Sequence, residues 1–224
     1  MVTASCTSLY VPNVRNAPLF REQGEAQIST YLTSGGLEFQ GAYAVTDHVA
    51  AIGSYAFGKA NRSSPDYTWK NSYAELGLGY FDRSRSARYE VLGGYGLGQG
   101  TNYDQYYFFG LASVVSTAKM QRIFLQPSIG TNNRDVNIIF TPRFTMVTYS
   151  EFTDAVKTVK PNEKAQFFVE PALTLKFRLA GNLHGFCQLG IIAPVSGAVY
   201  FDYLNPQVAA GIQIDTGGLR TRVY

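Results

Sequence analysis

Apolar and polar residues alternate along positions 164–179 with almost no break. Successive side chains of a β-strand point to opposite faces, so this pattern predicts one strand with an apolar face and a polar, charged face. The run is longer than an ordinary globular strand, whose usual length is roughly 5–6 residues. A strand that crosses a bilayer needs about 9–11 residues, with apolar side chains toward the lipid. The pattern therefore predicts a membrane barrel with oily residues outside and charges inside. The apolar face consists of Ala165, Phe167, Val169, Pro171, Leu173, Leu175, Phe177 and Leu179.

Similar alternating segments, separated by turn residues, recur through the chain. They cover residues 25–33, 37–45, 48–59, 69–81, 88–98, 118–130, 136–149, 164–179, 184–193 and 206–215. Short connections at 46–47, 82–87, 132–135 and 180–182 alternate with longer ones at 60–66, 99–117, 150–163 and 195–205. Bacterial outer-membrane barrels have short periplasmic turns and longer extracellular loops. The expected fold is all-β: a closed antiparallel up-and-down transmembrane β-barrel of about ten strands, with eight as the fallback and both termini periplasmic.

The expected domain organisation is a leader at 1–24, the barrel at 25–216 and a tail at 217–224. Pro12 and Pro18 favour extended backbone in the leader, which reads either as a tether or plug strand or as a disordered terminus. Proline inside a strand removes a hydrogen-bond donor, so Pro127, Pro142, Pro171 and Pro194 conflict with regular strands. Bulges at these positions would resolve the conflict.

Composition agrees with a barrel wall. Charged residues make up 16% of the chain, below the roughly 25% of soluble domains, and the mean hydropathy is only −0.08. No run of about 18 apolar residues exists, which excludes a transmembrane helix. Sixteen Tyr and fifteen Phe suit aromatic girdles at the two interfaces. A soluble Tyr-rich β-protein is the alternative. The net charge of +3 comes from scattered basic residues, so no nucleic-acid partner is expected.

The inward faces carry acids and bases in balance, and this set is the candidate site. Its members are Glu38, Glu75, Glu90, Glu170, Arg122, Arg143, Lys176 and Arg178. An unpaired buried charge is costly, so we expect these groups to pair inside a lumen filled by side chains. A narrow polar pore with charges at its constriction is the alternative. Inward glycines at 77, 79, 94 and 96 leave space for large side chains such as Tyr73 and Phe124, or mark a bend.

Enzymatic chemistry is not predicted. The two histidines, His48 and His184, fall beside predicted short turns, and Asp47 would point away from His48 on any shared strand. No Gly-x-Ser-x-Gly nucleophile elbow is present. Two histidines and a lipid-facing Cys187 do not make a usual zinc site, so neither a metal nor a cofactor is expected.

The connection at 99–117 is rich in aromatic residues, namely Tyr103, Tyr106, Tyr107, Phe108 and Phe109. Exposed aromatics mark contact surfaces, and the partner would then be another membrane protein, a glycan or lipopolysaccharide. The alternative is that these residues extend two strands and form the outer aromatic girdle.

Small residues followed by Cys6 are similar to the end of a bacterial lipoprotein signal, although the apolar region that should precede it is missing. The motifs 10–13 (Tyr-Val-Pro-Asn), 16–19 (Asn-Ala-Pro-Leu), 23–27 and 41–49 resemble small outer-membrane β-barrel lipoproteins of Bacteroidota. The resemblance implies an outer-membrane location and a barrel fold, but little chemistry. The similarity of residues 1–6 to the end of a lipoprotein signal implies lipidation at Cys6.

The expected function is a structural or accessory interaction subunit of an outer-membrane assembly, in contact with membrane lipid. The alternatives are a narrow outer-membrane channel and a soluble secreted barrel that binds a small ligand.

Overall fold

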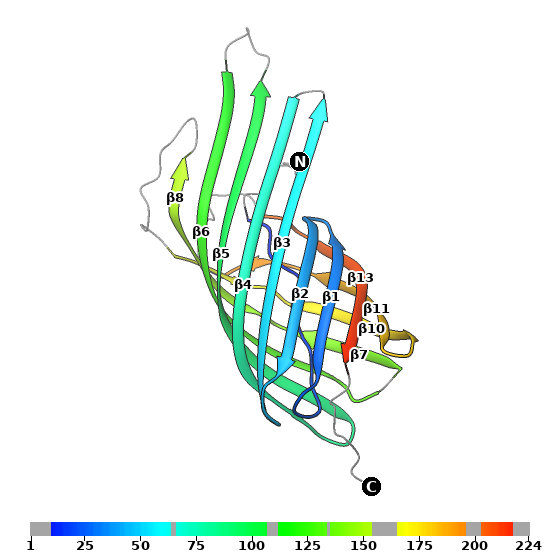
Figure 1. Cartoon of the computed structure of the whole chain (residues 1–224). Helices are drawn as coiled ribbons and strands as arrows, with labels where there is room; N and C mark the ends of the chain where they lie inside the picture. The colour runs from blue at the N-terminus through cyan, green and yellow to red at the C-terminus, as the bar shows by residue number, and fades with distance from the viewer. Residues whose placement is uncertain are drawn as a thin grey trace.

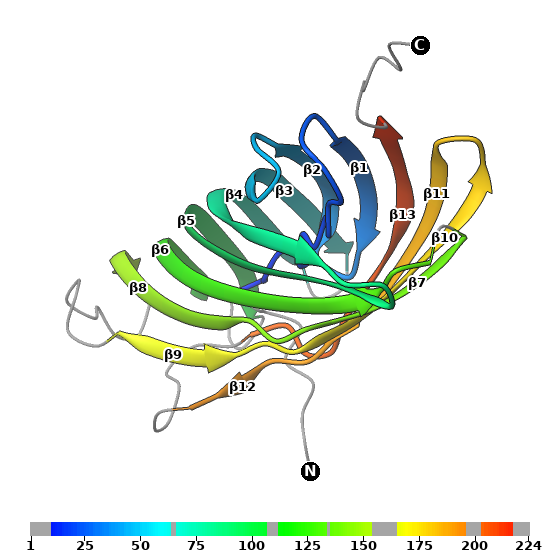
Figure 2. The ribbon, with the colours of Figure 1, turned by 90° about the horizontal axis from the view of Figure 1, so that it is seen from below.

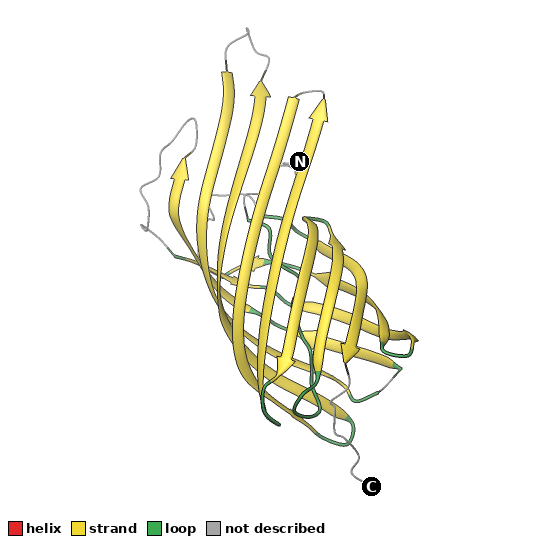
Figure 3. Cartoon of the chain, in the orientation of Figure 1, coloured by secondary structure: helices red, strands yellow, loops and turns green. Residues whose placement is uncertain are grey.

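The computed structural model describes residues 10–63, 66–106, 112–133, 135–153, 165–195 and 203–216. Within these ranges no helix could cross a membrane, and the regular elements are β-strands (Figure 3). They are β1 (Ala26–Thr33), β2 (Gly36–Ala44), β3 (Val49–Ser63), β4 (Asp66–Arg83), β5 (Ala87–Tyr106), β6 (Ala112–Thr131), β7 (Val136–Thr141), β8 (Phe144–Thr153), β9 (Gln166–Val169), β10 (Ala172–Ala180), β11 (Leu183–Gly190), β12 (Ala193–Pro194) and β13 (Gln207–Thr216).

These segments form one closed antiparallel barrel. Three pairs of segments, β7 with β8, β9 with β10 and β11 with β12, are single strands interrupted once, so the barrel has ten strands. It closes because β13 pairs with β1, while β7 and β8 both pair with β6. Figure 2 shows the strands curving around a central space. The predicted fold class is confirmed, including the ten-strand count.

The two ends of the barrel differ. The turns β2–β3, β4–β5, β6–β7 and β10–β11 lie at one end, which we call the short-turn mouth. At the other end, the long-strand mouth, β3 to β6 extend well beyond the rest of the wall (Figure 1). The sheet pairs residue by residue as far as Ser63 with Asp66 and Tyr106 with Ala112. The predicted loops at 60–66 and 99–117 are therefore too long, because both are largely strand.

Outward-facing aliphatic and aromatic side chains, such as Leu32, Leu76, Leu173 and Leu175, form an apolar belt around the barrel. Leu76 is 75% exposed and Leu32 is 72% exposed, although both are large aliphatic side chains. Leu173 and Leu175 of β10 also point outward, whereas Thr174 and Lys176, which alternate with them, are buried. Exposed apolar area of this extent marks a membrane or protein contact. The alternation thus has the predicted faces, with oily residues outside and polar residues inside.

Three of the four prolines, at positions 127, 142 and 171, interrupt the ladder in one row instead of creating bulges, whereas Pro194 lies in β12 and pairs in register with Phe168. By register, Pro127 of β6 lies opposite Pro142, which in turn lies opposite Pro171. Arg143 and Glu170 exchange backbone hydrogen bonds of 3.3 and 2.7 Å beside this row. Because donors are missing from three neighbouring strands at the same height, β7–β8 and β9–β10 break there without loss of register.

Two of the four inward glycines, Gly94 and Gly96, make room for aromatic rings as predicted, whereas a Cβ on Gly77 or Gly79 would meet strand backbone and the aliphatic side chains of Ile52 or Leu92. A Cβ on Gly94 would lie 2.5 Å from the Phe124 ring, and a Cβ on Gly96 would lie 2.4 Å from the Tyr73 hydroxyl. Because these glycines have no Cβ, the rings of Phe124 and Tyr73 can pack directly against the inner face of the barrel wall.

Candidate functional site

The lumen is occupied by residues Tyr10–Phe20, which we call the plug segment. It enters at the long-strand mouth, where Tyr10 forms a parallel bridge with Tyr203, and leaves at the short-turn mouth, where Gly24 N–H bonds to the Ala44 carbonyl. Figure 2 shows this N-terminal part of the chain inside the ring of strands. Of the two sequence interpretations of this segment, the structure has the plug strand. Residues 1–9 and 217–224, which include Cys6, lie outside the described residues.

The plug segment carries the chain before β1 from one mouth of the barrel to the other. β1 begins and β13 ends at the short-turn mouth, where Ala26 pairs with Thr216. Tyr10 lies at the opposite mouth because the chain before β1 crosses the lumen. The described part of the chain therefore begins and ends at opposite mouths; the two termini, which were predicted to lie on one side, fall outside the described residues.

Side chains bind the backbone of the plug segment along its length. Each carbonyl from Pro12 to Leu19 accepts a hydrogen bond from a side-chain donor. In chain order of the carbonyls, the donors are Gln207, Arg15, Gln40, Gln188, Gln126, Lys176, Gln27 and Arg88. Apart from Arg15, which belongs to the plug segment, each donor comes from the barrel wall. Buried backbone groups need such partners, and an extended chain without a ladder can find them only in side chains.

Wall side chains also accept from the plug N–H groups. Glu38 accepts from Val14 at 2.9 Å, Gln188 from Arg15 at 2.9 Å, and Glu90 from Leu19 at 2.8 Å. Leu19 has a φ of 50°, which is uncommon for a residue with a side chain. Its N–H and carbonyl are both held, by Glu90 and Arg88, so the wall fixes this strained turn of the chain.

An ionic cluster lies in the middle of the lumen. Glu75 bonds to Arg122 and lies 3.5 Å from Arg143, and these side chains are essentially buried. Glu170 lies 3.6 Å from Arg15 and accepts a 2.5 Å hydrogen bond from the Tyr10 hydroxyl. That hydroxyl in turn accepts from Arg122 at 2.8 Å. Plug and wall charges therefore form one network. A buried charge without a partner would cost several kcal/mol.

Most of the residues in the candidate set lie in this lumen. The buried members are Glu38, Glu75, Glu90, Glu170, Arg122, Arg143 and Lys176. Arg178 lies elsewhere, at the short-turn mouth, where its side chain is 40% exposed and 3.4 Å from Asp135. Arg178 lies near the end of β10, where the lumen opens to solvent.

Sequence reasoning missed Arg15 and Tyr10 as members of the network. The plug segment has no alternation, because wall side chains surround it on all sides, so its pattern did not mark these residues as buried.

The candidate aromatic surface falls partly outside the described residues. Tyr103 and Tyr106 belong to β5, so the structure has the alternative in which the strand continues through them. Tyr107, Phe108 and Phe109 lie outside the described residues. Cys187 is exposed on the outer face, as its position in the alternation predicts.

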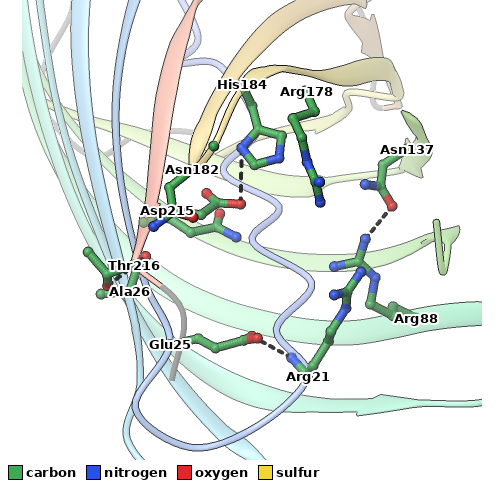
Figure 4. A pocket seen from close by; sticks show the side chains of 12 residues that line it. Arg21, Glu25, Ala26, Arg88, Asn137, Arg178, Asn182, His184, Asp215 and Thr216 are labelled. Carbon is green, nitrogen blue, oxygen red and sulfur yellow. Dashed lines mark hydrogen bonds and ion pairs between the residues drawn. The ribbon is translucent and has the colours of Figure 1, made fainter. Parts of the chain in front are cut away.

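A polar cavity of about 150 Å³ opens at the short-turn mouth (Figure 4). Arg21, Arg88 and Arg178 approach it from one side, with Glu25 and Asp215 on the other. Glu25 accepts from the Arg21 N–H at 2.7 Å, and burial raises the pKa of this carboxyl group. Three arginines face two carboxylates here, and the cavity lies where the plug segment turns into β1. We interpret it as the polar end of the lumen.

The described residues contain no group of three or more His, Cys, Asp or Glu side chains that could hold a metal ion. The described lumen residues are mainly donors and acceptors already paired with one another. These side chains bind the plug segment in the lumen.

Comparison with known proteins supports the fold. No family model matches the chain, and no curated protein sequence matches it. Among solved structures, it is similar to the translocator domain of the autotransporter NalP from Neisseria meningitidis, with a TM-score of 0.52, 10% identity and 85% coverage of both chains. A KdgM porin in complex with disordered oligogalacturonate also matches, with a TM-score of 0.36, 10% identity and coverage of 85% of this chain and 98% of that one. The resemblance to Bacteroidota lipoproteins stays a prediction. The strand pairing and the similarity to the NalP translocator domain establish the fold. It is a closed ten-stranded antiparallel barrel of the kind found in outer-membrane proteins.

Proposed function

We propose that the chain is a barrel of the bacterial outer membrane, closed by its own N-terminal segment, that serves as a structural or accessory subunit of an outer-membrane assembly. The apolar belt supports the membrane location, because soluble proteins rarely expose apolar patches larger than a few hundred Å². A soluble barrel with a small ligand would need a free cavity, whereas the plug segment fills this one. We assign the short-turn mouth to the periplasm, following the general rule for such barrels.

The observation that carries the accessory role is the fixed plug segment. Its carbonyls from Pro12 to Leu19 are bound by side chains, so removing the plug segment from the lumen would break many hydrogen bonds at once. The narrow channel is therefore the weaker candidate. The long hairpins β3–β4 and β5–β6 extend beyond the belt and provide surface for a partner outside the hydrocarbon.

Two measurements test the membrane and closure parts. The full chain should migrate differently before and after heating in detergent, and it should resist extraction from vesicles by carbonate. In planar bilayers it should give no steps of current above background. Release by carbonate would contradict the membrane location, and stepwise conductance would favour the channel.

A pull-down in mild detergent from native membranes, followed by mass spectrometry, tests the subunit role. The matched variant removes residues 58–71 and closes the hairpin with a tight turn, which keeps the β3–β4 register because Gly58 pairs with Asn71. A second variant removes residues 101–117 in the same way, since Thr101 pairs with Thr117. We expect a partner that is retained by the wild type and lost from at least one variant. Recovery of the wild-type protein alone would contradict the subunit role.

A further inference from the structure

The outer face of β3 to β6 changes from apolar to polar along one cross-strand row. In this row Phe57 lies opposite Ser72, Ser72 opposite Gln99, and Gln99 opposite Lys119. Exposed Tyr55 lies below Phe57 on the same outward face of β3. This row therefore marks where the hydrocarbon belt ends on the long-strand side, and residues just above it lie at the depth of lipid headgroups.

Two lysines lie directly opposite each other above this boundary. Lys59 of β3 pairs in register with Lys70 of β4, and both are exposed on the outer face. Directly opposed residues on antiparallel strands have Cβ atoms about 4.5–5.5 Å apart, and like charges there repel. Among the described side chains neither lysine forms an ion pair, whereas nearby Lys119 has Glu151 at 3.0 Å. The lysine pair therefore lacks a described anion to offset its repulsion.

A shallow groove of about 330 Å³ lies below the lysines on the same surface. Tyr55, Ala74 and Leu97 supply its apolar part, and Ser72, Gln99 and the ion-paired Lys119 lie at its polar edge. The charged pair and the groove are thus arranged in the order of a lipid molecule, with a headgroup position above and an alkyl position below. The hydroxyl groups of Ser72 and Thr101 could also donate hydrogen bonds to a headgroup. Thr101 lies opposite Lys70 in the sheet.

We propose that Lys59 and Lys70 bind the phosphate of an anionic lipid in the leaflet on the long-strand side, with its acyl chain against Tyr55, Ala74 and Leu97. The inference rests on the proposed membrane location. A lysine near a bilayer surface favours anionic lipid by about five-fold, so the pair should contribute about thirty-fold.

The test uses the full chain, folded in micelles of a neutral detergent, and measures binding of dioctanoyl phosphatidic acid, dioctanoyl phosphatidylcholine and inorganic phosphate. We expect the wild type to prefer phosphatidic acid by more than ten-fold over the other two probes. K59Q/K70Q should reduce that affinity about thirty-fold, and K59R/K70R should restore most of it. The charge-matched control is R83Q/R85Q, which removes two exposed positive charges at the opposite mouth and should bind like the wild type.

Three results would overturn the lipid site: equal binding by K59Q/K70Q and the wild type, an equal loss in R83Q/R85Q, or inorganic phosphate binding as tightly as the lipid. Heat-dependent migration checks that each variant is folded, and K59R/K70R keeps the test valid if K59Q/K70Q does not fold. A wild type that resists carbonate extraction but shows no lipid preference would refute this site alone. A wild type that fails the extraction test would refute the membrane proposal first.

Discussion

Replacing Glu170 by Gln should destabilise the fold much more than the same substitution in an exposed ion pair. Glu170 and Arg15 are fully buried 3.6 Å apart, and Glu170 also accepts from the Tyr10 hydroxyl. E170Q keeps the shape of the side chain but leaves the Arg15 charge without its carboxylate. Breaking a buried pair in this way costs about 3–5 kcal/mol of folding free energy. That cost is a change of roughly two to nearly four powers of ten in the folding equilibrium constant.

The matched control is E151Q, the same substitution in the exposed pair of Glu151 with Lys119. These side chains are 64% and 58% exposed at a distance of 3.0 Å, and such pairs contribute about 0–1 kcal/mol. Urea unfolding of the two variants in lipid vesicles, followed by heat-dependent migration, measures the difference. The double variant R15M/E170Q should lose less than the sum of its single changes, because the Arg15 charge is removed together with the carboxylate that compensates it. A loss in E170Q no larger than in E151Q would refute the view that plug and wall charges stabilise each other.

Three further outcomes follow from the same geometry. L76R places a charge on the apolar belt and should cost about 2–4 kcal/mol by urea unfolding, whereas S86R in the exposed β4–β5 turn should change little. G98A puts a Cβ 2.1 Å from the Tyr73 ring and should cost about 1–3 kcal/mol, and less when combined with Y73L; an unchanged midpoint would mean that the ring moves freely. In a C6S background, Cys187 should react in vesicles with a lipid-soluble maleimide but not with a charged one. A17C in a cysteine-free background should react with neither reagent, because position 17 is buried in the plug segment. Labelling of A17C by the charged reagent would show that the plug segment leaves the lumen.

The barrel wall could be predicted from sequence because its two faces meet different surroundings. Leu173 and Leu175 face outward while Thr174 and Lys176 face inward, and this difference appears in the sequence as a period of two. The alternation also placed Glu75 and Arg122 in the lumen, where they pair. Their partnership was not predictable, because it depends on which strands become neighbours in the closed sheet.

Above the belt the pattern fails for a physical reason. The outward positions of the long hairpins no longer meet hydrocarbon, so Lys59, Lys70 and Gln99 replace apolar residues and the alternation disappears. The strands nevertheless continue, because backbone pairing such as Lys59 with Lys70 does not depend on side-chain polarity. A sequence read by hydropathy therefore ends each strand near the membrane surface and takes the projecting part for a loop.

The way the plug segment is bound fixes its position along the barrel axis. A segment held by a backbone ladder can shift by two residues and form equivalent bonds, since every ladder donor is alike. Here the donors to successive carbonyls differ: Gln40 on β2 serves Val14, Gln188 on β11 serves Arg15, and Gln126 on β6 serves Asn16. A shift of one residue would misplace these donors together and would also carry Arg15 away from Glu170. A gate that slides is therefore disfavoured, and opening the lumen would require the plug segment to leave as a unit. That cost is the physical basis for our proposal of a closed, structural barrel.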